Sequence, residues 1–155
     1  MVFTLVAMSN RFIFEQAPGH LIRRAHQISV AVFADEVGAH AVTPVQFAIL
    51  NLLLGQPGID QITLAQGVAF DAATIGSVIG RLEKKGWLRR QPDVADRRRK
   101  LLWLTPEGER AAGALKPLVE GAQQHILEPL SADEQKQLVA LLSKLVTHHP
   151  RRAAT

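Results

Sequence analysis

The sequence contains no cysteine and no tyrosine, and aromatic residues make up only 5% of its 155 residues. Without cysteine the chain forms no disulfide bond and has no thiol for redox sensing, which fits a reducing cytoplasm. No run of about 18 consecutive apolar residues occurs, so no membrane span is predicted. The apolar opening MVFTLVAM lacks a basic n-region and a cleavage pattern, and we interpret it as an N-terminal extension and not as a signal peptide.

Signatures of enzymes are also missing. The chain has no glycine-rich phosphate loop, no nucleophile–base pattern and no paired carboxylates, so we predict no catalytic residue and no cofactor. Six histidines are present, but His20 and His26 are six residues apart and His125 stands alone. Zinc sites on helices favour ligands four residues apart. A metal-responsive protein is therefore an alternative that no spacing favours.

Positive charge is concentrated in one short segment. The chain carries a net charge of +4, yet residues 81–100 contain nine Lys or Arg and only three Asp or Glu. This segment alone has a net charge of +6, which leaves −2 for the rest of the chain. A local basic patch on a nearly neutral body is typical of a surface that binds a polyanion, usually nucleic acid. The alternative is a solvated, charge-rich loop.

Two helices are predicted in the first part of the chain. Apolar residues at three- and four-residue spacing extend from Pro18 to about Val37, and Gly38 is placed to end this helix. Thr43 and Pro44 then supply an N-cap and a first-turn proline. The segment that follows, VQFAILNLLL, is apolar on nearly every side and is expected at the centre of the structure.

The middle of the chain predicts a helix-turn-helix followed by a wing. Asp60 and Asp71 are placed to cap two short helices, and Gly86 lies where a glycine commonly ends a helix. The second helix turns its apolar residues inward: Ile75, Val78, Ile79 and Leu82. Two strand-like runs, WLRRQ (87–91) and KLLWLT (100–105), then flank the charged loop PDVADRRR. A hairpin in this position is typical of a winged helix-turn-helix.

Long helices remain at the C-terminal end. One begins at Pro106 and extends to about Leu130, and Ser131 with Glu134 forms a capping box for a last helix that ends near Val146, before a tail expected to fray. Helices at both ends with an apolar stripe predict a homodimer. The expected division is 1–42 (N-terminal extension and dimerisation helix), 43–105 (winged DNA-binding lobe) and 106–155 (C-terminal dimerisation helices and tail).

Three stretches resemble the MarR-type winged-helix transcriptional regulators: RLEKKGWLRRQPD (81–93), DRRRKLLWLTPEG (96–108) and TPVQFAILNLL (43–53). The resemblance extends from about Pro18 to Val146. It implies a mostly α fold with a small β-hairpin wing, in a homodimer whose winged lobes bind a pseudo-palindromic operator on double-stranded DNA. It also implies a repressor that a small aromatic carboxylic acid releases from DNA, as in the regulation of aromatic compound catabolism.

The expected DNA-reading helix has a small outward face. Thr74 and Ser77 are candidate base readers there, although many family members carry an arginine in place of Ser77. Gly76 and Gly80 each cost about 1 kcal/mol relative to alanine inside a helix. Either close approach to DNA or close packing against another helix would explain these glycines. The full set of predicted DNA-binding residues is Thr74, Ser77, Arg81, Lys84, Arg90, Arg97, Arg98 and Arg99.

In the wing, the resemblance assigns separate roles to the clustered arginines. Arg98 would enter a minor groove, which attracts arginine where it is narrow. Arg97 and Arg99 would contact flanking phosphates, and Asp96 would hold the arginine geometry through an ion pair. A winged helix that binds only proteins is an alternative, but such a module does not need so many arginines.

Candidate effector-binding residues lie mainly on the first helix. His20, Arg24 and Gln27 share one stripe, where Arg24 could bind a carboxylate through two hydrogen bonds. Phe47 and Trp103 are candidate aromatic walls, and Trp103 is expected to point away from the lobe interior, over the dimer helices or a ligand. The resemblance favours an acid of the benzoate, hydroxycinnamate or nicotinate kind. The alternative for His20 and Arg24 is hydrogen bonding between subunits or a solvated face.

Overall fold

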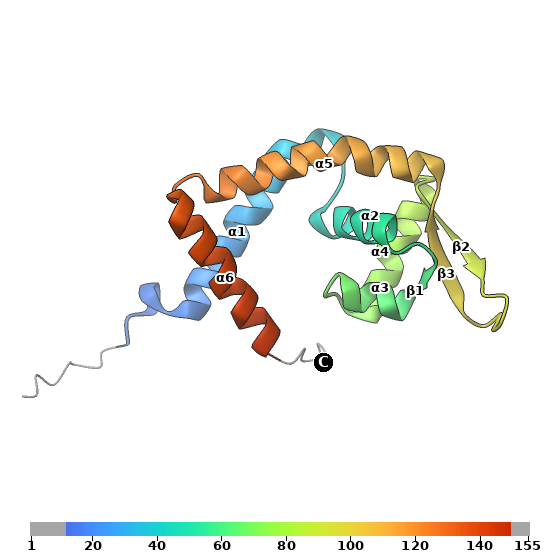
Figure 1. The fold of residues 1–155 in the computed structure, drawn as a ribbon, viewed down its shortest axis with the longest axis horizontal. Coiled ribbons are helices and arrows are strands. Elements are labelled where there is room, and N and C mark those ends of the chain that lie inside the picture. Colours follow the sequence, from blue (N-terminus) through green and yellow to red (C-terminus); the bar gives the residue numbers. More distant parts are fainter. Residues whose placement is uncertain (1–11, 150–155) are drawn as a thin grey trace, which may run out of the picture.

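The computed structural model describes residues 12–149, so the opening segment MVFTLVAM and the last six residues lie outside the description. Most of the described residues are helical, and one small antiparallel sheet completes the fold, which confirms the predicted fold class (Figure 1). The elements in chain order are η1 (Phe14–Gln16), α1 (Pro18–Val37), η2 (Gly38–His40), α2 (Pro44–Gly55), β1 (Ile59–Asp60), α3 (Gln61–Gly67), α4 (Ala72–Lys84), β2 (Leu88–Pro92), β3 (Lys100–Leu104), α5 (Pro106–Leu127) and α6 (Ala132–His148).

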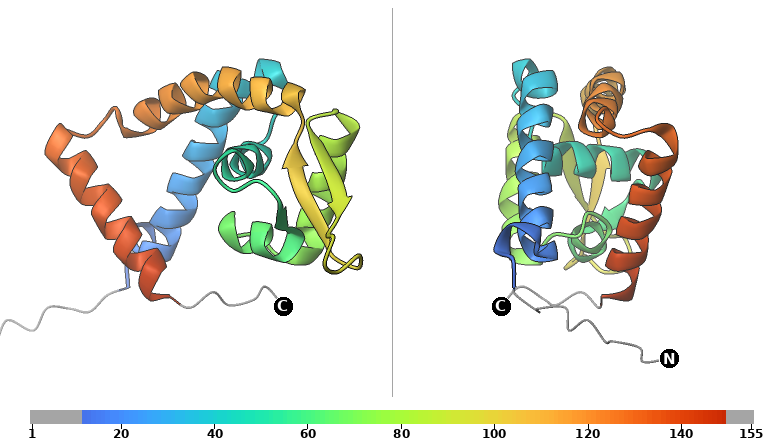
Figure 2. Two further views of the ribbon diagram at one scale, coloured as in Figure 1. Left: turned by 45° about the vertical axis from the view of Figure 1, so that its right-hand side comes forward. Right: turned by 90° about the vertical axis from the view of Figure 1, so that its left-hand side faces the viewer.

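The helix α5 connects two parts of the molecule. In Figure 1 it extends along the top, from the winged lobe on the right to α1 and α6 on the left. The lobe contains α2, α3, α4 and the sheet, whereas α1 and α6 descend from α5 as two arms. The two arms overlap in Figure 1, but the right-hand view of Figure 2 shows them apart, on opposite sides of the molecule.

Predicted N-caps begin the lobe helices. The Thr43 side chain accepts from the Gln46 backbone N–H, and Gln46 completes a capping box. Asp60 and Asp71 accept the Thr63 and Thr74 backbone N–H groups at 2.8 and 2.7 Å. Each cap satisfies a backbone donor that the first turn of a helix leaves unpaired.

The chain ends α1 differently from the prediction. Gly38 keeps a right-handed helical conformation and continues into η2. The left-handed residue is Ala41, with a φ of 49°. Its carbonyl accepts a hydrogen bond from the Lys85 ammonium at 2.6 Å, a tertiary contact that no local pattern indicates.

The lobe has a continuous apolar core. The central helix α2 contributes Ile49, Leu50 and Leu53, all at most 1% exposed. The predicted inward face of α4 is buried as expected, and Leu102 and Leu104 of β3 close the core from the sheet side. Most of the fold's large, fully buried side chains therefore lie in the lobe.

The sheet has one strand more than the sequence predicted. Its order is β1–β3–β2, and β1 pairs with β3 so that Ile59 lies opposite Leu102 and Asp60 opposite Leu101. Two residues are too short to produce an alternating pattern. This strand joins the base of the wing to the beginning of α3.

The turn between β3 and α5 contains Thr105 and Gly108 of the stretch DRRRKLLWLTPEG. Thr105 caps α5 by accepting the Gly108 backbone N–H at 3.0 Å, and its hydroxyl donates to the Gly86 carbonyl at 2.6 Å. A Cβ on Gly108 would lie 2.0 Å from the Trp87 carbonyl oxygen. Only glycine fits this close approach of α5 to the chain that follows α4.

The arms bury little within the protomer. No residue of α6 is buried, and its exposed apolar side chains are Val139, Leu141, Leu142, Leu145 and Val146. An open groove lies between the arms, lined by apolar residues of α1, α5 and α6. Among the described helices, none is alone long and apolar enough to cross a membrane, although two sharply bent helix pairs meet the length and composition criteria together.

Candidate nucleic-acid interface

The outward face of α4 is made of small and basic residues. Thr74, Ser77, Arg81 and Lys84 are all exposed, opposite the buried Ile75, Val78, Ile79 and Leu82. The Ser77 hydroxyl donates to the Thr74 carbonyl at 2.9 Å, so in this state Ser77 offers only its acceptor lone pairs outward. The helix dimensions and this exposed surface suit insertion into a DNA major groove.

The two α4 glycines have little to pack against within the protomer. Apart from the neighbouring residues and backbone of α4 itself, no described heavy atom lies within 4 Å of a Cβ built on Gly80. A Cβ on Gly76 would meet only the flexible Gln61 side chain, whose Nε2 lies 3.1 Å away. Packing against another helix of the same protomer therefore does not account for Gly80, and close approach of α4 to DNA stays a prediction.

The nine basic residues of segment 81–100 divide into two groups. Four are engaged within the protein, as ion pairs, a hydrogen bond or contacts with a ring: Lys85, Arg89, Arg90 and Arg99. The other five have no ion pair with any described residue: Arg81, Lys84, Arg97, Arg98 and Lys100. These five, on α4 and the wing, are the cations available to a polyanion.

Arg90 forms an ion pair with α4. Its Nε lies 3.0 Å from Oε2 of Glu83, and both side chains are about one-third exposed. The pair connects β2 to α4. Arg90 is therefore engaged within the lobe, whereas its predicted contact with DNA needs a side chain that is free. This pairing is invisible in the sequence because seven residues and a change of element separate the partners.

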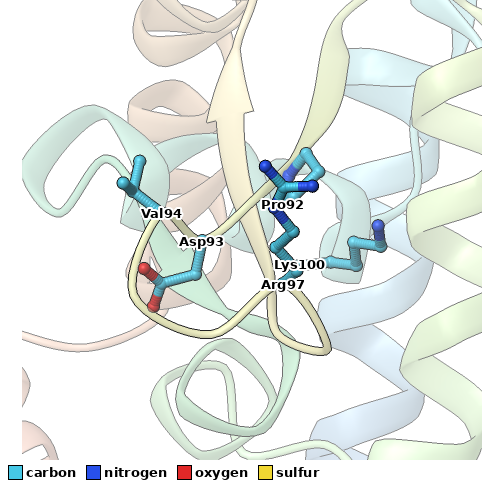
Figure 3. A pocket seen from close by; sticks show the side chains of 5 residues that line it. All are labelled: Pro92, Asp93, Val94, Arg97 and Lys100. Atoms are coloured by element: carbon cyan, nitrogen blue, oxygen red, sulfur yellow. The ribbon is translucent and has the colours of Figure 1, made fainter.

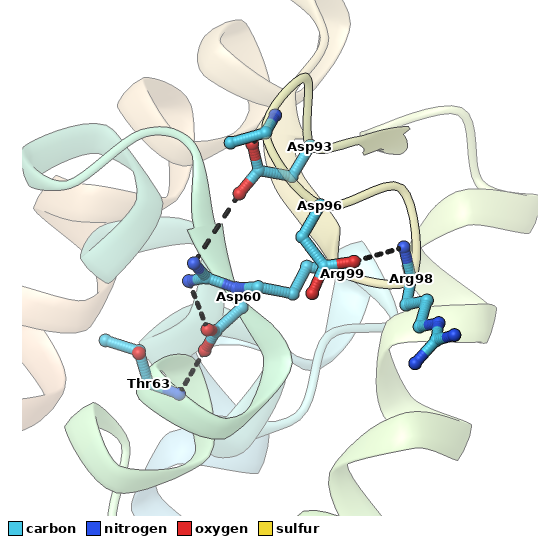
Figure 4. A network of polar contacts seen from close by, with 7 residues as sticks. Asp60, Thr63, Asp93, Asp96, Arg98 and Arg99 are labelled. Atoms are coloured by element: carbon cyan, nitrogen blue, oxygen red, sulfur yellow. Dashed lines mark hydrogen bonds and ion pairs between the residues drawn. The ribbon is translucent and has the colours of Figure 1, made fainter.

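The wing loop is organised by two aspartates (Figure 4). Asp93 accepts the Ala95 backbone N–H at 2.9 Å, and Asp96 accepts the Arg98 backbone N–H at 3.0 Å. The prediction that Asp96 forms an ion pair with an arginine was wrong, because Asp96 forms no ion pair with any described residue. Asp96 shapes the turn through the backbone and leaves the Arg98 guanidinium free.

Arg99 also departs from its expected role. Its guanidinium donates to Oδ2 of Asp60 at 2.6 Å and lies 3.5 Å from Oδ2 of Asp93, as Figure 4 shows. The hydrogen bond from the Thr63 backbone N–H, supported by Arg99, lowers the pKa of Asp60 to about 2. Arg99 therefore neutralises carboxylates of the lobe itself, and the prediction that it contacts a phosphate is not supported by its position. Asp60 and Asp93 are site residues that sequence reasoning missed.

An open hollow lies beside the wing loop. Pro92, Asp93, Val94, Arg97 and Lys100 line it, and Figure 3 shows the Arg97 and Lys100 side chains extending away from the loop. Val94 is fully exposed at the edge of this hollow. Two unpaired cations around a solvent-open depression suit contacts with the sugar–phosphate edge of a duplex.

The residues predicted to bind an effector do not form one cluster. On α1, His20 lies 3.4 Å from the Arg23 guanidinium and its ring packs near Phe14, while Arg24 and Gln27 are exposed. Phe47, on α2, packs partly buried against the lobe core. These four residues remain predictions.

Trp103, the fifth residue predicted to line an effector pocket, also stays a prediction. Leu102 and Leu104 face the core as expected, so Trp103 faces the other way. A Cβ on Gly58 would lie 2.6 Å from its ring, and the Arg89 guanidinium lies 5.6 Å from the ring centroid. Trp103 thus covers the turn before β1, which contains Gly58. Its buried Nε1 has no hydrogen-bond partner among residues 12–149.

Within residues 12–149, no group of three or more His, Asp or Glu side chains is arranged to hold a metal ion. The groove between the arms contains polar residues that the sequence did not indicate as effector contacts, namely His26, Ser29 and Gln123. A search for helical spacing within α1 would have found the first two, but not their approach to α5.

Comparison with known proteins gives consistent matches. The model of the MarR family matches residues 42–100. The transcriptional regulator HosA of Escherichia coli O157:H7 is 33% identical over 127 residues, which covers 82% of this chain and 93% of HosA. The transcriptional repressor NicR of Pseudomonas putida is 30% identical over 128 residues, which covers 83% of this chain and 81% of NicR.

Two solved structures share the arrangement of arms and lobe. Bordetella bronchiseptica BpsR, whose DNA binding is regulated by 6-hydroxynicotinic acid, has a TM-score of 0.86 at 32% identity and covers 90% of this chain and 99% of its own. Streptomyces coelicolor PcaV in complex with its natural ligand has a TM-score of 0.82 at 36% identity, and the match covers 89% of this chain and 97% of PcaV.

Proposed function

Because the chain belongs to the MarR family of transcriptional regulators, we propose that it is a homodimeric repressor that binds a pseudo-palindromic DNA operator. The observation that carries this proposal is the surface formed by Arg81, Lys84, Arg97, Arg98 and Lys100. These side chains follow α4 and the wing, which are the elements that enter the major and minor grooves in winged helices. A regulator of this kind acts on chromosomal DNA, so we place it in the cytoplasm.

The dimer is supported by the arms. Exposed apolar side chains on α6 and on the first half of α1 are difficult to reconcile with an isolated protomer. The proposed division assigns residues 1–42 and 106–155 to dimerisation and residues 43–105 to DNA. Two-fold symmetry then predicts half-sites about 10 base pairs apart, or a multiple of that.

A small aromatic carboxylic acid is the proposed effector. BpsR responds to 6-hydroxynicotinic acid, and this relative supports the chemical class. Within this chain, His20, Arg24, Gln27 and Phe47 are the proposed contacts. The exposed Arg24 guanidinium offers two parallel donors to a carboxylate.

Binding to selected DNA tests the function. Duplexes are selected by the purified protein from a random library, and one selected duplex is titrated at 50 and 200 mM salt with a scrambled duplex as control. With roughly 6–10 phosphate contacts, affinity should fall about 10³–10⁵-fold between these salt concentrations. Failure to enrich any duplex, with or without aromatic acids present, would contradict the proposal.

A further inference from the structure

Arg99 lies where three segments of the winged lobe meet. It is the last residue before β3, Asp93 follows the end of β2, and Asp60 begins α3. The Arg99 guanidinium reaches both carboxylates, at 2.6 Å from Oδ2 of Asp60 and 3.5 Å from Oδ2 of Asp93. One planar side chain therefore connects the wing loop to the helix-turn-helix.

Both carboxylates are held by other groups. Oδ1 of Asp60 accepts the Thr63 backbone N–H, and Oδ1 of Asp93 accepts the Ala95 backbone N–H. Their side chains are only 21% and 18% exposed, whereas Arg99 is 53% exposed. Each aspartate uses one oxygen to order its own backbone and the other to hold Arg99, so the arginine connects two prearranged anchors.

Backbone pairing alone does not attach the wing loop to α3. The β1–β3 ladder ends at the Asp60–Leu101 pair. The backbone hydrogen bonds beyond it, from the Asp93 N–H to the Arg99 carbonyl and from the Arg99 N–H to the Asp96 carbonyl, stay within the loop. Side-chain contacts must therefore fix the loop relative to the helix-turn-helix.

We propose that Arg99 is a positioning residue for DNA binding: by bridging Asp60 and Asp93 it sets the direction of the wing relative to α4, and it does not contact DNA itself. This inference rests on the proposed function. Arg97 and Arg98 occupy the same turn without an ion pair to any described residue, so the direction of the loop decides where their guanidinium groups meet the duplex. Lysine could not replace Arg99, because a single ammonium lacks the planar fork that spans two carboxylates.

The most informative variant is Asp60→Asn. Asparagine caps a helix about as well as aspartate, so α3 is retained. The substitution removes a negative charge beside the DNA-binding surface, and simple electrostatics predicts tighter binding. Loss of the bridge predicts the opposite, a decrease in affinity of about tenfold for a selected duplex. Asp35→Asn, an exposed residue on α1, is the matched control for removing one negative charge.

Arg99→Lys and Arg99→Leu separate positioning from phosphate contact. Each operator binds two wings. Losing a phosphate contact in each wing would therefore make the negative slope of log affinity against log salt less steep by about 2. A positioning residue predicts weaker binding with a slope close to that of the wild type, and Arg99→Lys no better than Arg99→Leu. Circular dichroism and sedimentation establish that each variant is folded and assembled as the wild type is.

Amide hydrogen exchange of the peptide covering residues 93–99, without DNA, provides a second readout. Faster exchange in Asp60→Asn and Arg99→Leu than in the wild type is expected. Binding by Asp60→Asn that equals or exceeds wild type, full function of Arg99→Lys, or unchanged exchange each overturns the inference while leaving the proposed function intact. A wild-type protein that selects no duplex overturns the proposed function, and this inference with it.

Discussion

In the winged lobe, α2 buries Ile49, Leu50 and Leu53 and α4 buries its whole inward face, whereas no residue of α6 is buried. The lobe has a complete core, helix caps and a braced wing within one chain. The arms have caps as well, because Ser131 and Glu134 form a capping box, but they lack a covering layer. Local signals therefore form helices equally well in both regions. Only in the lobe do these helices pack against other elements of the same protomer and bury their apolar faces.

The largest expected effect comes from a substitution in an arm, which tests whether the arms need a second protomer to cover them. Leu142 lines the groove between α1, α5 and α6, and Leu142→Asp places a charge there. We expect a folded monomer whose operator affinity falls by about 100-fold or more, because linked lobes gain roughly 10²–10⁴ from binding together. Sedimentation velocity and DNA titration measure both effects.

The control for Leu142→Asp is Gln56→Asp, at an exposed position just after α2. It should leave both assembly and affinity unchanged. A Leu142→Asp protein that sediments as the wild type and binds DNA equally well would remove the arms from the proposed dimer.

A core substitution in the lobe should act in the opposite way. Ile79 is fully buried in α4, and Ile79→Ala should lower the free energy of unfolding by about 2–5 kcal/mol through the lost transfer energy and the cavity left behind. Urea denaturation at several protein concentrations measures this loss. For Leu142→Ala, the loss should depend on protein concentration, because it acts through association. Similar concentration dependence in both variants would contradict the contrast.

Within the lobe, Arg98 should contribute more to operator affinity than the loss of one positive charge explains. Arg98→Ala should weaken operator binding by about 1–3 kcal/mol, because a groove contact is lost. Arg110→Ala, which removes an exposed arginine paired with Glu107 on α5, controls for net charge. Fluorescence anisotropy provides the affinities, and equal effects of the two substitutions would remove the groove contact from Arg98.

On the arm side, Arg24→Ala tests the effector proposal. Calorimetry with benzoate, 4-hydroxycinnamate and nicotinate should show about a tenfold or greater loss of affinity for whichever acid the wild type binds, since a charge-assisted hydrogen bond contributes about 1.5–3 kcal/mol. Arg110→Ala, which removes an exposed arginine on α5, is the matched control. Retained affinity in Arg24→Ala would exclude this residue from the pocket.

The smallest expected effect separates folding from DNA binding at α4. Gly80→Ala should increase the free energy of unfolding by about 1 kcal/mol, because alanine is the better helix former and no described atom outside the adjoining part of α4 lies within 4 Å of the new methyl group. The same methyl group should weaken DNA binding a few-fold if the helix backbone approaches the duplex. Gly113→Ala, on the exposed face of α5, should raise stability without changing affinity.

Much of the architecture was predictable because its signals are local. The inward face of α4, the caps at Thr43, Asp60 and Asp71, and the boundaries of α1 and of the hairpin all depend on residues within a few positions of one another. The third strand was missed because two residues carry no period. The helix α1 ends at Val37 as predicted, but the role of Gly38 was wrong: the left-handed residue after α1 is Ala41, whose carbonyl accepts from Lys85 across 44 residues.

The amino-acid sequence by itself determined the order of helices, the inward residues of the lobe and the concentration of arginine in the wing. Only the tertiary structure decided which of those arginines are free. Charge composition does not distinguish Arg98 from Arg99, yet the fold brings Asp60 to Arg99 across 39 residues and leaves Arg98 without an ion pair among the described residues. Ion pairs of this kind depend on distances in space, and a linear pattern does not encode them.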